Sequence, residues 1–280
     1  MDIGFIGAGK AGFSMGKYLT ERKINVTGYY SKTPLSSVQA AKFTGTRQYL
    51  SIEELVRDSE VIFITVPDGQ IASVWEEVKS LNIQGKKICH FSGSLTSAIF
   101  EGISDADASG YSVHPLFAIN SKYESYKDFP KAHFTVEGDP AHLGEITGLL
   151  EGLGNPVTVI SSEDKARYHA AAAMASNLYV GLCDLCERML TDCGFTRENA
   201  HKALAPLILG NTENIVKSGP EGALTGPIER NDISTVKKHL ECLSKEEKEV
   251  YICLSGQVIK VAQGRHPERD YAQMKGVLRK

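Results

Sequence analysis

The sequence lacks several features, and each absence excludes a class of protein. No apolar run within its 280 residues approaches the ~20 residues of a membrane-spanning helix, and no charged and then apolar leader precedes the first strand. With 31 basic and 34 acidic residues, the formal net charge is -3, and no basic stripe of a nucleic-acid-binding domain is present. We therefore expect a cytoplasmic protein that binds neither membrane nor nucleic acid.

Cysteine is also scarce, with six residues and no spacing of a disulfide framework. Cys183 and Cys186 lie three residues apart on a predicted helix, but a structural zinc site needs four ligands and no second pair follows. Buried free cysteines behave as small hydrophobic residues. We expect reduced thiols and no metal site.

A glycine-rich stretch directly follows the first predicted strand, residues 1–6. It reads G-x-G-x-x-G and runs into a predicted helix, the order that suits a dinucleotide. Free N–H groups at such a helix start, with the positive end of the helix dipole, bind phosphates. A purely structural turn is the alternative. The predicted cofactor-binding residues of this turn are Gly7, Ala8, Gly9, Lys10, Ala11 and Gly12.

The second strand is predicted at residues 24–30. Sites that prefer NAD usually have an aspartate or glutamate directly after this strand, and this sequence has neither there. Ser31, Lys32 and Thr33 stand there instead. Hydroxyl groups and an ammonium suit a 2′-phosphate, so the sequence favours NADP over NAD as the cofactor, with an ordinary polar turn as the alternative.

Further strands are predicted at residues 61–66, 86–91, 111–113, 133–138 and 156–160, and helices lie between several of them. Ligands of open α/β sheets bind beyond the carboxyl ends of the strands. His114 follows one strand and is placed for proton transfer. Five residues at the ends of two other strands are predicted to line the nicotinamide pocket: Val66, Pro67, Asp68, Ser92 and Gly93. The alternative is that these residues only form ordinary strand-to-helix turns.

The pattern changes near residue 161, after which helices dominate. Residues 165–193 predict one long helix, too apolar for a surface helix, with a polar stripe through Lys165, His169 and Ser176, and Asn177 nearby. Shorter helices are predicted at 203–216, 232–240 and 244–263. Between them, a Gly-Pro loop carries Arg230, which suits a carboxylate or a phosphate.

The predicted fold class is therefore α/β, with an N-terminal Rossmann-type doubly wound sheet followed by an all-α C-terminal domain. We expect an NADP-binding domain at residues 1–160 and a helical substrate and dimerisation domain at residues 161–280.

The order of these motifs, with Thr225-Gly226-Pro227-Ile228, resembles the Rossmann-like NADP-dependent oxidoreductases that carry a C-terminal domain of unknown function, number 2520. Wider relatives are ketopantoate and pyrroline-carboxylate reductases and β-hydroxyacid and prephenate dehydrogenases. The resemblance implies an active site between the two domains and a homodimer through the helical one. Lys165 matches a catalytic lysine of two of these groups, although His169 stands where they have asparagine. His114-Pro115 is similar to the catalytic His-Pro pair of prephenate dehydrogenases.

These features predict an oxidoreductase that transfers a hydride between NADP(H) and a small oxo or imino acid, with a ketopantoate-type reductase favoured. An oxidative, prephenate-like dehydrogenase and a non-catalytic NADP-binding sensor remain alternatives. Candidate catalytic residues are Lys165, His169, His114, Ser92, Ser176, Asn177 and Arg230.

Overall fold

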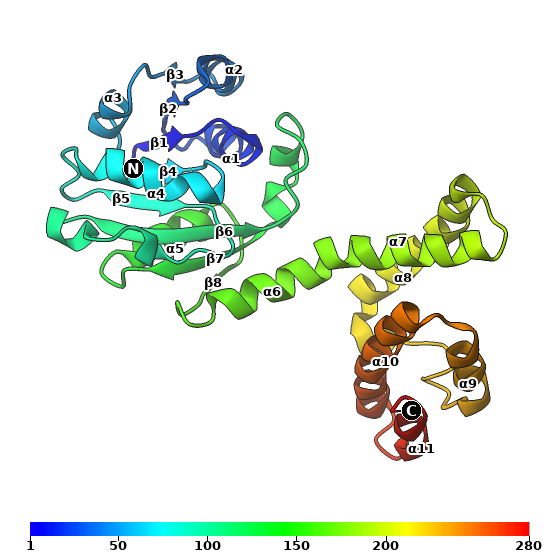
Figure 1. Cartoon of the computed structure of the whole chain (residues 1–280). Helices are drawn as coiled ribbons and strands as arrows, with labels where there is room; N and C mark the ends of the chain where they lie inside the picture. The colour runs from blue at the N-terminus through cyan, green and yellow to red at the C-terminus, as the bar shows by residue number, and fades with distance from the viewer. Residues whose placement is uncertain (280) are drawn as a thin grey trace. The chain divides into compact units, whose positions relative to one another are not determined.

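The computed structural model describes residues 1–279 and divides into two compact units, Met1–Ala175 and Ser176–Lys280 (Figure 1). The domain boundary predicted at residue 160 follows the last strand. The division between units falls later, because helix α6 (Lys165–Ala175) packs onto the sheet through Lys165, whose ammonium bonds Ser112.

The first unit contains an eight-stranded sheet with the order β3-β2-β1-β4-β5-β6-β7-β8. All neighbouring strands are parallel except β6 and β7, which pair antiparallel. The strand predicted at residues 111–113 is longer than expected, so His114 lies inside a strand and not after its end. The strands are β1 (Ile3–Ile6), β2 (Val26–Tyr30), β3 (Arg47–Gln48), β4 (Val61–Ile64), β5 (Lys87–His90), β6 (Ser109–Leu116), β7 (His133–Gly138) and β8 (Val157–Val159).

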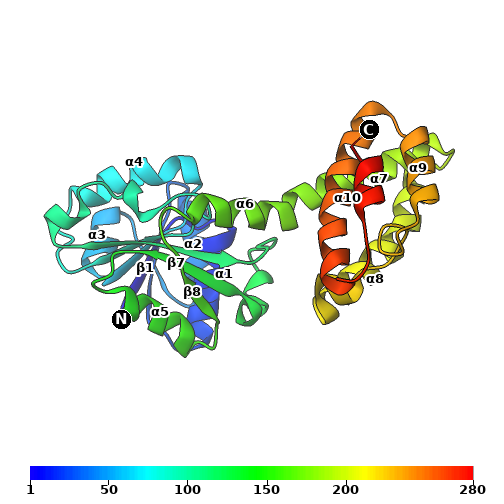
Figure 2. The same cartoon turned by 90° about the horizontal axis from the view of Figure 1, so that it is seen from below.

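Helices cover both faces of this sheet, because neighbouring residues of each buried strand point to opposite sides. Phe63 of β4 packs in a core with α1 (Lys10–Glu21), α2 (Pro34–Thr44) and α5 (Leu143–Gly152). The adjacent Ile62 packs in a second core with α3 (Ile52–Arg57) and α4 (Asp68–Lys79). Figure 2 shows α4 and α5 on opposite sides of the sheet. The predicted doubly wound fold is confirmed.

Some helix boundaries are readable from the sequence. α3 begins after Ser51, whose hydroxyl accepts a hydrogen bond from the Glu54 backbone at 3.2 Å, and serine is a preferred residue at this capping position. Short 3₁₀ turns at Ser97–Ile99, Ile103–Ala106, Ser125–Lys127 and Phe129–Lys131 complete the connections.

The second unit is helical, which confirms the all-α C-terminal part. Its small core gathers Val236, Ile259, Ala262, Tyr271 and Met274. No helix within residues 1–279 combines the length and apolar character needed to cross a bilayer. The helices are α7 (Asn177–Asp192), α8 (Arg197–Ala223), α9 (Ile233–Cys242), α10 (Lys245–Arg265) and α11 (Ala272–Val277).

The prediction of a single long helix at residues 165–193 is wrong. The helix breaks at Ser176, whose backbone has φ −124° and ψ −81° and which precedes the first turn of α7. The Ser176 hydroxyl donates to Asn177 Oδ1 at 3.1 Å. Adjacent serine and asparagine side chains offer such local bonds in competition with the helical ladder. Within the single chain α7 is not buried, since Leu178 and Val180 are 62% and 68% exposed.

A buried amide links three segments of the first unit. Asn155, just before β8, accepts a hydrogen bond from the Tyr18 hydroxyl at 2.5 Å. Its own amide nitrogen donates to the carbonyls of Phe129 and Ala132 at 2.7 and 2.9 Å. These bonds tie the end of α1 to the entry of β7.

Replacing Asn155 with alanine removes all three of these buried hydrogen bonds, although the Phe129 carbonyl still accepts from the Ala132 backbone at 2.9 Å and the Tyr18 hydroxyl still lies 3.5 Å from the Leu153 carbonyl. Each lost bond costs about 0.5–1.5 kcal/mol, so we expect Asn155→Ala to lower the free energy of unfolding of this unit by roughly 3 kcal/mol in urea titrations. Asn82→Ala, at an exposed position, is the control and should change it by less than ~0.5 kcal/mol. Equal effects of the two substitutions would contradict this role.

Candidate functional site

A pocket of about 380 Å³ opens at the carboxyl ends of β1, β2 and β4. Its volume is in the range of small-molecule sites. Eight of its fifteen lining residues are predicted cofactor-binding residues: Gly7, Ala8, Gly9, Ser31, Lys32, Thr33, Val66 and Pro67.

The three glycines of the turn have different physical roles. Gly7 has φ +107°, a conformation that other residues rarely adopt. A Cβ on Gly12 would lie 2.2 Å from Thr65 Oγ1, so helix and strand approach too closely for any side chain. At Gly9 a Cβ would meet only the Thr65 carbonyl, at 3.8 Å. Gly9 therefore leaves open space at the start of α1, where a phosphate would approach the backbone.

The remaining predicted cofactor residues lie outside this pocket's lining. Lys10 and Ala11 are in the first turn of α1. Asp68 begins α4, and its carboxylate accepts hydrogen bonds from the hydroxyls of Ser92 at 2.7 Å and Ser94 at 3.2 Å. This contact joins the carboxyl ends of β4 and β5 and engages the Ser92 proton.

Gly93, after β5, is where the histidines predicted to act in catalysis meet. The register of β5 and β6 ends with His90 opposite Ser112, so His114 extends past the end of β5, beside the turn that follows it. A Cβ on Gly93 would lie 2.8 Å from His114 Nε2 and 2.7 Å from His169 Cδ2. Only glycine therefore fits between the two imidazoles, whose ring centroids are 6.5 Å apart.

The other ring nitrogen of His114 is bound within the same unit. Nδ1 lies 2.6 Å from the hydroxyl of Tyr168 on α6, and the two rings meet edge to face. Burial, more than the nearby charges of Lys165 and His169, lowers the pKa of His114 to about 4. At neutral pH His114 is therefore uncharged.

Lys165 of α6 is fully buried and donates to Ser112 Oγ at 2.5 Å. Burial lowers the pKa of its ammonium to about 8, against the opposing effect of the Glu137 and Asp68 carboxylates. Glu137 lies opposite Ser112 across β6 and β7, and accepts hydrogen bonds from Ser97 through both carboxylate oxygens. A cation and an anion are thus held on one face of the sheet, close to His114.

The polar stripe predicted on the long helix exists over its first part. Lys165 and His169 share the face of α6 that meets the sheet at Ser112 and Gly93. Ser176 stands at the helix break and, with Asn177 and Arg230, belongs to the second unit. The catalytic roles of these three residues stay predictions.

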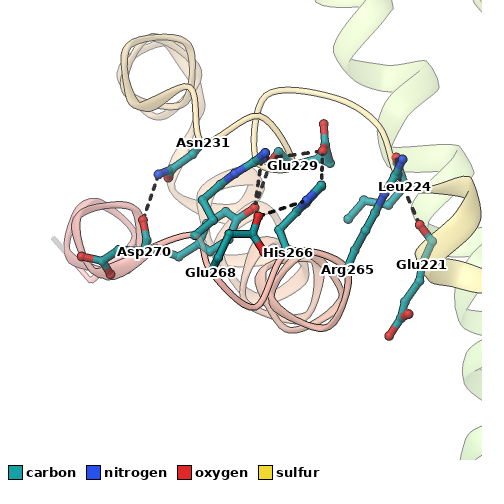
Figure 3. Close-up of polar contacts among 10 residues, drawn as sticks. Glu221, Leu224, Glu229, Asn231, Arg265, His266, Glu268 and Asp270 are labelled. Carbon is teal, nitrogen blue, oxygen red and sulfur yellow. Dashed lines mark hydrogen bonds and ion pairs between the residues drawn. The ribbon is translucent and has the colours of Figure 1, made fainter.

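The loop around Arg230 is fixed by the C-terminal segment of its own unit (Figure 3). The Glu229 carboxylate lies 2.7 Å from His266 Nε2. The backbone carbonyl of Glu229 accepts hydrogen bonds from the Arg269 guanidinium and from the Tyr271 hydroxyl. Asn231 donates to the Asp270 carbonyl at 2.9 Å. The Arg230 side chain between these anchors is exposed.

Sequence reasoning missed three residues of the first-unit site: Tyr168, Ser112 and Glu137. Tyr168 follows Lys165 by three residues, so helical spacing alone places it near the predicted stripe. Ser112 and Glu137 gave no such signal, because their proximity depends on the antiparallel register of β6 and β7.

Two family models match the chain. Residues 1–115 match the Rossmann-like domain, and residues 132–258 match a domain of unknown function, DUF2520. One curated protein, the candidate 6-phosphogluconate dehydrogenase YqeC of Bacillus subtilis, is 29% identical over 89 residues, which span 31% of this chain and 30% of that protein.

Solved structures cover almost the whole chain. Protein TM1727 from Thermotoga maritima is 26% identical with a TM-score of 0.74, covering 96% of this chain and all of that one. The candidate NADP oxidoreductase BF3122 from Bacteroides fragilis is 20% identical with a TM-score of 0.68, over 92% and 98% of the two chains. A pyrroline-5-carboxylate reductase from Coxiella burnetii is 16% identical with a TM-score of 0.58, over 94% and 95%. The chain shares its fold with NAD(P)-dependent reductases, and it matches a Rossmann-like domain and a DUF2520 domain one after the other.

Proposed function

We propose that this protein is an NADP(H)-dependent oxidoreductase acting on a small oxo or imino acid. The observation that carries the proposal is the convergence of His114 and His169 on Gly93, at the same sheet edge as the glycine-rich pocket. Structures that share the fold include BF3122, pyrroline-5-carboxylate reductase and a reductive aminase in complex with NADPH.

The residues of the pocket fit this cofactor. The open space at Gly9 and the free N–H groups of α1 suit a pyrophosphate, and the exposed Lys32 suits a 2′-phosphate. Glu77 of α4 is the one carboxylate among the lining residues. When bound, NADPH would supply the hydride; all other chemistry belongs to the chain.

The chain's own groups suit the reduction of a polarised C=O or C=N bond. His114 and His169 can hydrogen-bond the atom that gains negative charge, and stabilisation of that charge is usually the largest catalytic contribution. The buried Lys165 ammonium, bonded to Ser112, adds positive potential near the two imidazoles. The Ser92 hydroxyl donates its proton to the Asp68 carboxylate, so we do not assign that proton to the substrate. We assign Arg230 to a substrate carboxylate and favour a ketopantoate-type 2-oxo acid.

A second candidate is an oxidative, prephenate-like dehydrogenase. It is favoured by the neutral state of His114, since a general base must be unprotonated before it accepts a proton. Turnover with a panel of oxo and imino acids plus NADPH, and of hydroxy acids plus NADP, distinguishes the two directions. If the protein binds NADPH tightly but turns over none of these acids, the non-catalytic sensor is favoured.

We also propose that the protein forms a homodimer through the helical unit, in the cytoplasm. α7 and α8 expose many apolar side chains for a monomer surface. The most exposed are Leu178 at 62%, Val180 at 68%, Leu207 at 62% and Val216 at 82%. A second copy of this apolar surface would cover them.

The cofactor preference predicts the effect of replacing Lys32. Lys32→Ala should weaken NADPH binding by about 1–3 kcal/mol, the cost of a lost charge-assisted contact, and should leave NADH binding unchanged. Fluorescence titration with both nucleotides measures this. Lys42→Ala, an exposed lysine outside the pocket, is the matched control, and Gly9→Val should abolish binding of both. Equal losses for NADPH and NADH with Lys32→Ala would refute the 2′-phosphate contact.

The charge of Lys165 predicts the pH dependence of turnover. Its ammonium exists below its pKa of about 8, so kcat should fall as the pH rises through that value. Lys165→Met should lower kcat by roughly 10²-fold and remove this alkaline limb. Lys86→Met is the control, because the Lys86 ammonium donates to the Ser59 carbonyl at 2.6 Å, at the amino end of β5. A parent enzyme with constant kcat from pH 7 to 9 would show that the charge is not required.

The dimer predicts a concentration-independent mass of two chains in analytical ultracentrifugation at micromolar concentration. Val216→Glu should shift the protein to monomer, because a charge cannot be buried without a partner. Leu50→Glu, at a position 80% exposed on the first unit, should not. A monomeric parent protein would sink the proposal.

A further inference from the structure

The two ring nitrogens of His114 have different surroundings. Nδ1 lies 2.6 Å from the Tyr168 hydroxyl, while Nε2 lies against Gly93, where an added Cβ would be only 2.8 Å away. One nitrogen is therefore bound inside the unit and the other is at the turn that ends β5. Tyr168 is not among the residues that the sequence pattern identified.

A neutral imidazole carries a single proton, so one ring nitrogen donates a hydrogen bond and the other accepts. His114 is neutral at physiological pH because burial lowers its pKa to about 4. The partner of Nδ1 decides which nitrogen has the proton.

The chemistry of the pair indicates the direction of the bond. A phenol is a better donor than an imidazole N–H, and a bare imidazole nitrogen is a better acceptor than a phenol oxygen. Burial raises the pKa of Tyr168, so its proton is retained, while the nearby Thr135 side chain has the opposite, smaller effect on this pKa. Thr135 lies opposite His114 across β6 and β7. Its hydroxyl can donate to the Tyr168 oxygen and leave the phenol proton to His114.

We propose that Tyr168 is a positioning residue that holds His114 in the tautomer with the proton on Nε2. The Tyr168 hydroxyl then donates to His114 Nδ1, and the Nε2 proton points outward at Gly93. His114 thereby presents a donor to the oxygen or nitrogen atom that is reduced. This use of the donor rests on the proposed function, whereas the tautomer itself does not.

The inference also separates the two candidate directions of reaction. An Nε2 that carries a proton stabilises the negative charge that develops during reduction. The same nitrogen cannot accept a proton from a hydroxy acid, so this tautomer disfavours His114 as the base of an oxidative dehydrogenase.

The test is ¹⁵N NMR of the full-length protein labelled at histidine, with no nucleotide or substrate added. Loss of signals in His114→Asn assigns the ring. In the parent protein we expect a pyridine-like Nδ1 and a protonated Nε2, and in Tyr168→Phe a shift of both nitrogens toward the average of two tautomers. Tyr251→Phe is the matched control, since Tyr251 forms an equivalent bond to His239 Nδ1 at 2.9 Å in the second unit. It should leave the His114 signals unchanged.

A parent protein with the proton on Nδ1 would overturn the inference without any variant, and so would a Tyr168→Phe protein with unchanged His114 signals. Titration of Tyr168→Phe and of the parent protein with NADPH separates a failure of the proposed function from a failure of the proposed tautomer. We expect parent-like binding, since Tyr168 is outside the pocket lining. Failure of NADPH to bind the parent protein would reject the proposed function but not the tautomer. Once a substrate is known, Tyr168→Phe should lower kcat by up to about 10²-fold, the value of one such donor, with little change in KM.

Discussion

The antiparallel pairing of β6 with β7 is the contact on which the candidate site depends. It carries β6 past the end of the parallel strand β5, so that His114 lies beside Gly93 and is not part of a connecting loop. The same register puts Glu137 opposite Ser112 and Thr135 opposite His114. A slip of one residue would turn all these side chains to the other face of the sheet, and the site would be lost.

Helix α6 completes the site from above this strand pair. Three of its residues, at positions i, i+3 and i+4, face the sheet: Lys165 at Ser112, Tyr168 at His114 and His169 at Gly93. This spacing is that of one helical face. The first unit therefore contains the glycine-rich pocket and a set of proton-bearing groups on one sheet, before any residue of the second unit is considered.

Burial sets the charge state of these groups. It lowers the pKa of His114 to about 4 and that of Lys165 to about 8, so at neutral pH the imidazole is uncharged and the ammonium retains its charge. The buried cation is tolerated because Ser112 accepts its hydrogen bond and the Glu137 carboxylate is close. A neutral donor beside a fixed positive charge is a combination suited to an atom that becomes negative during reduction.

The sequence by itself determined the parts of this protein whose signals are local. The glycine-rich turn, the apolar strands and the serine cap at Ser51 all follow from residues close together in the chain, and the fold class follows from their order. The break at Ser176 was missed because a helical pattern of apolar residues continues across it, while two polar side chains decide the backbone there. Only the tertiary structure decided that Tyr168, Ser112 and Glu137 join the site. Their contacts depend on strand register and on the packing of α6, which bring together residues that are 53 and 54 positions apart.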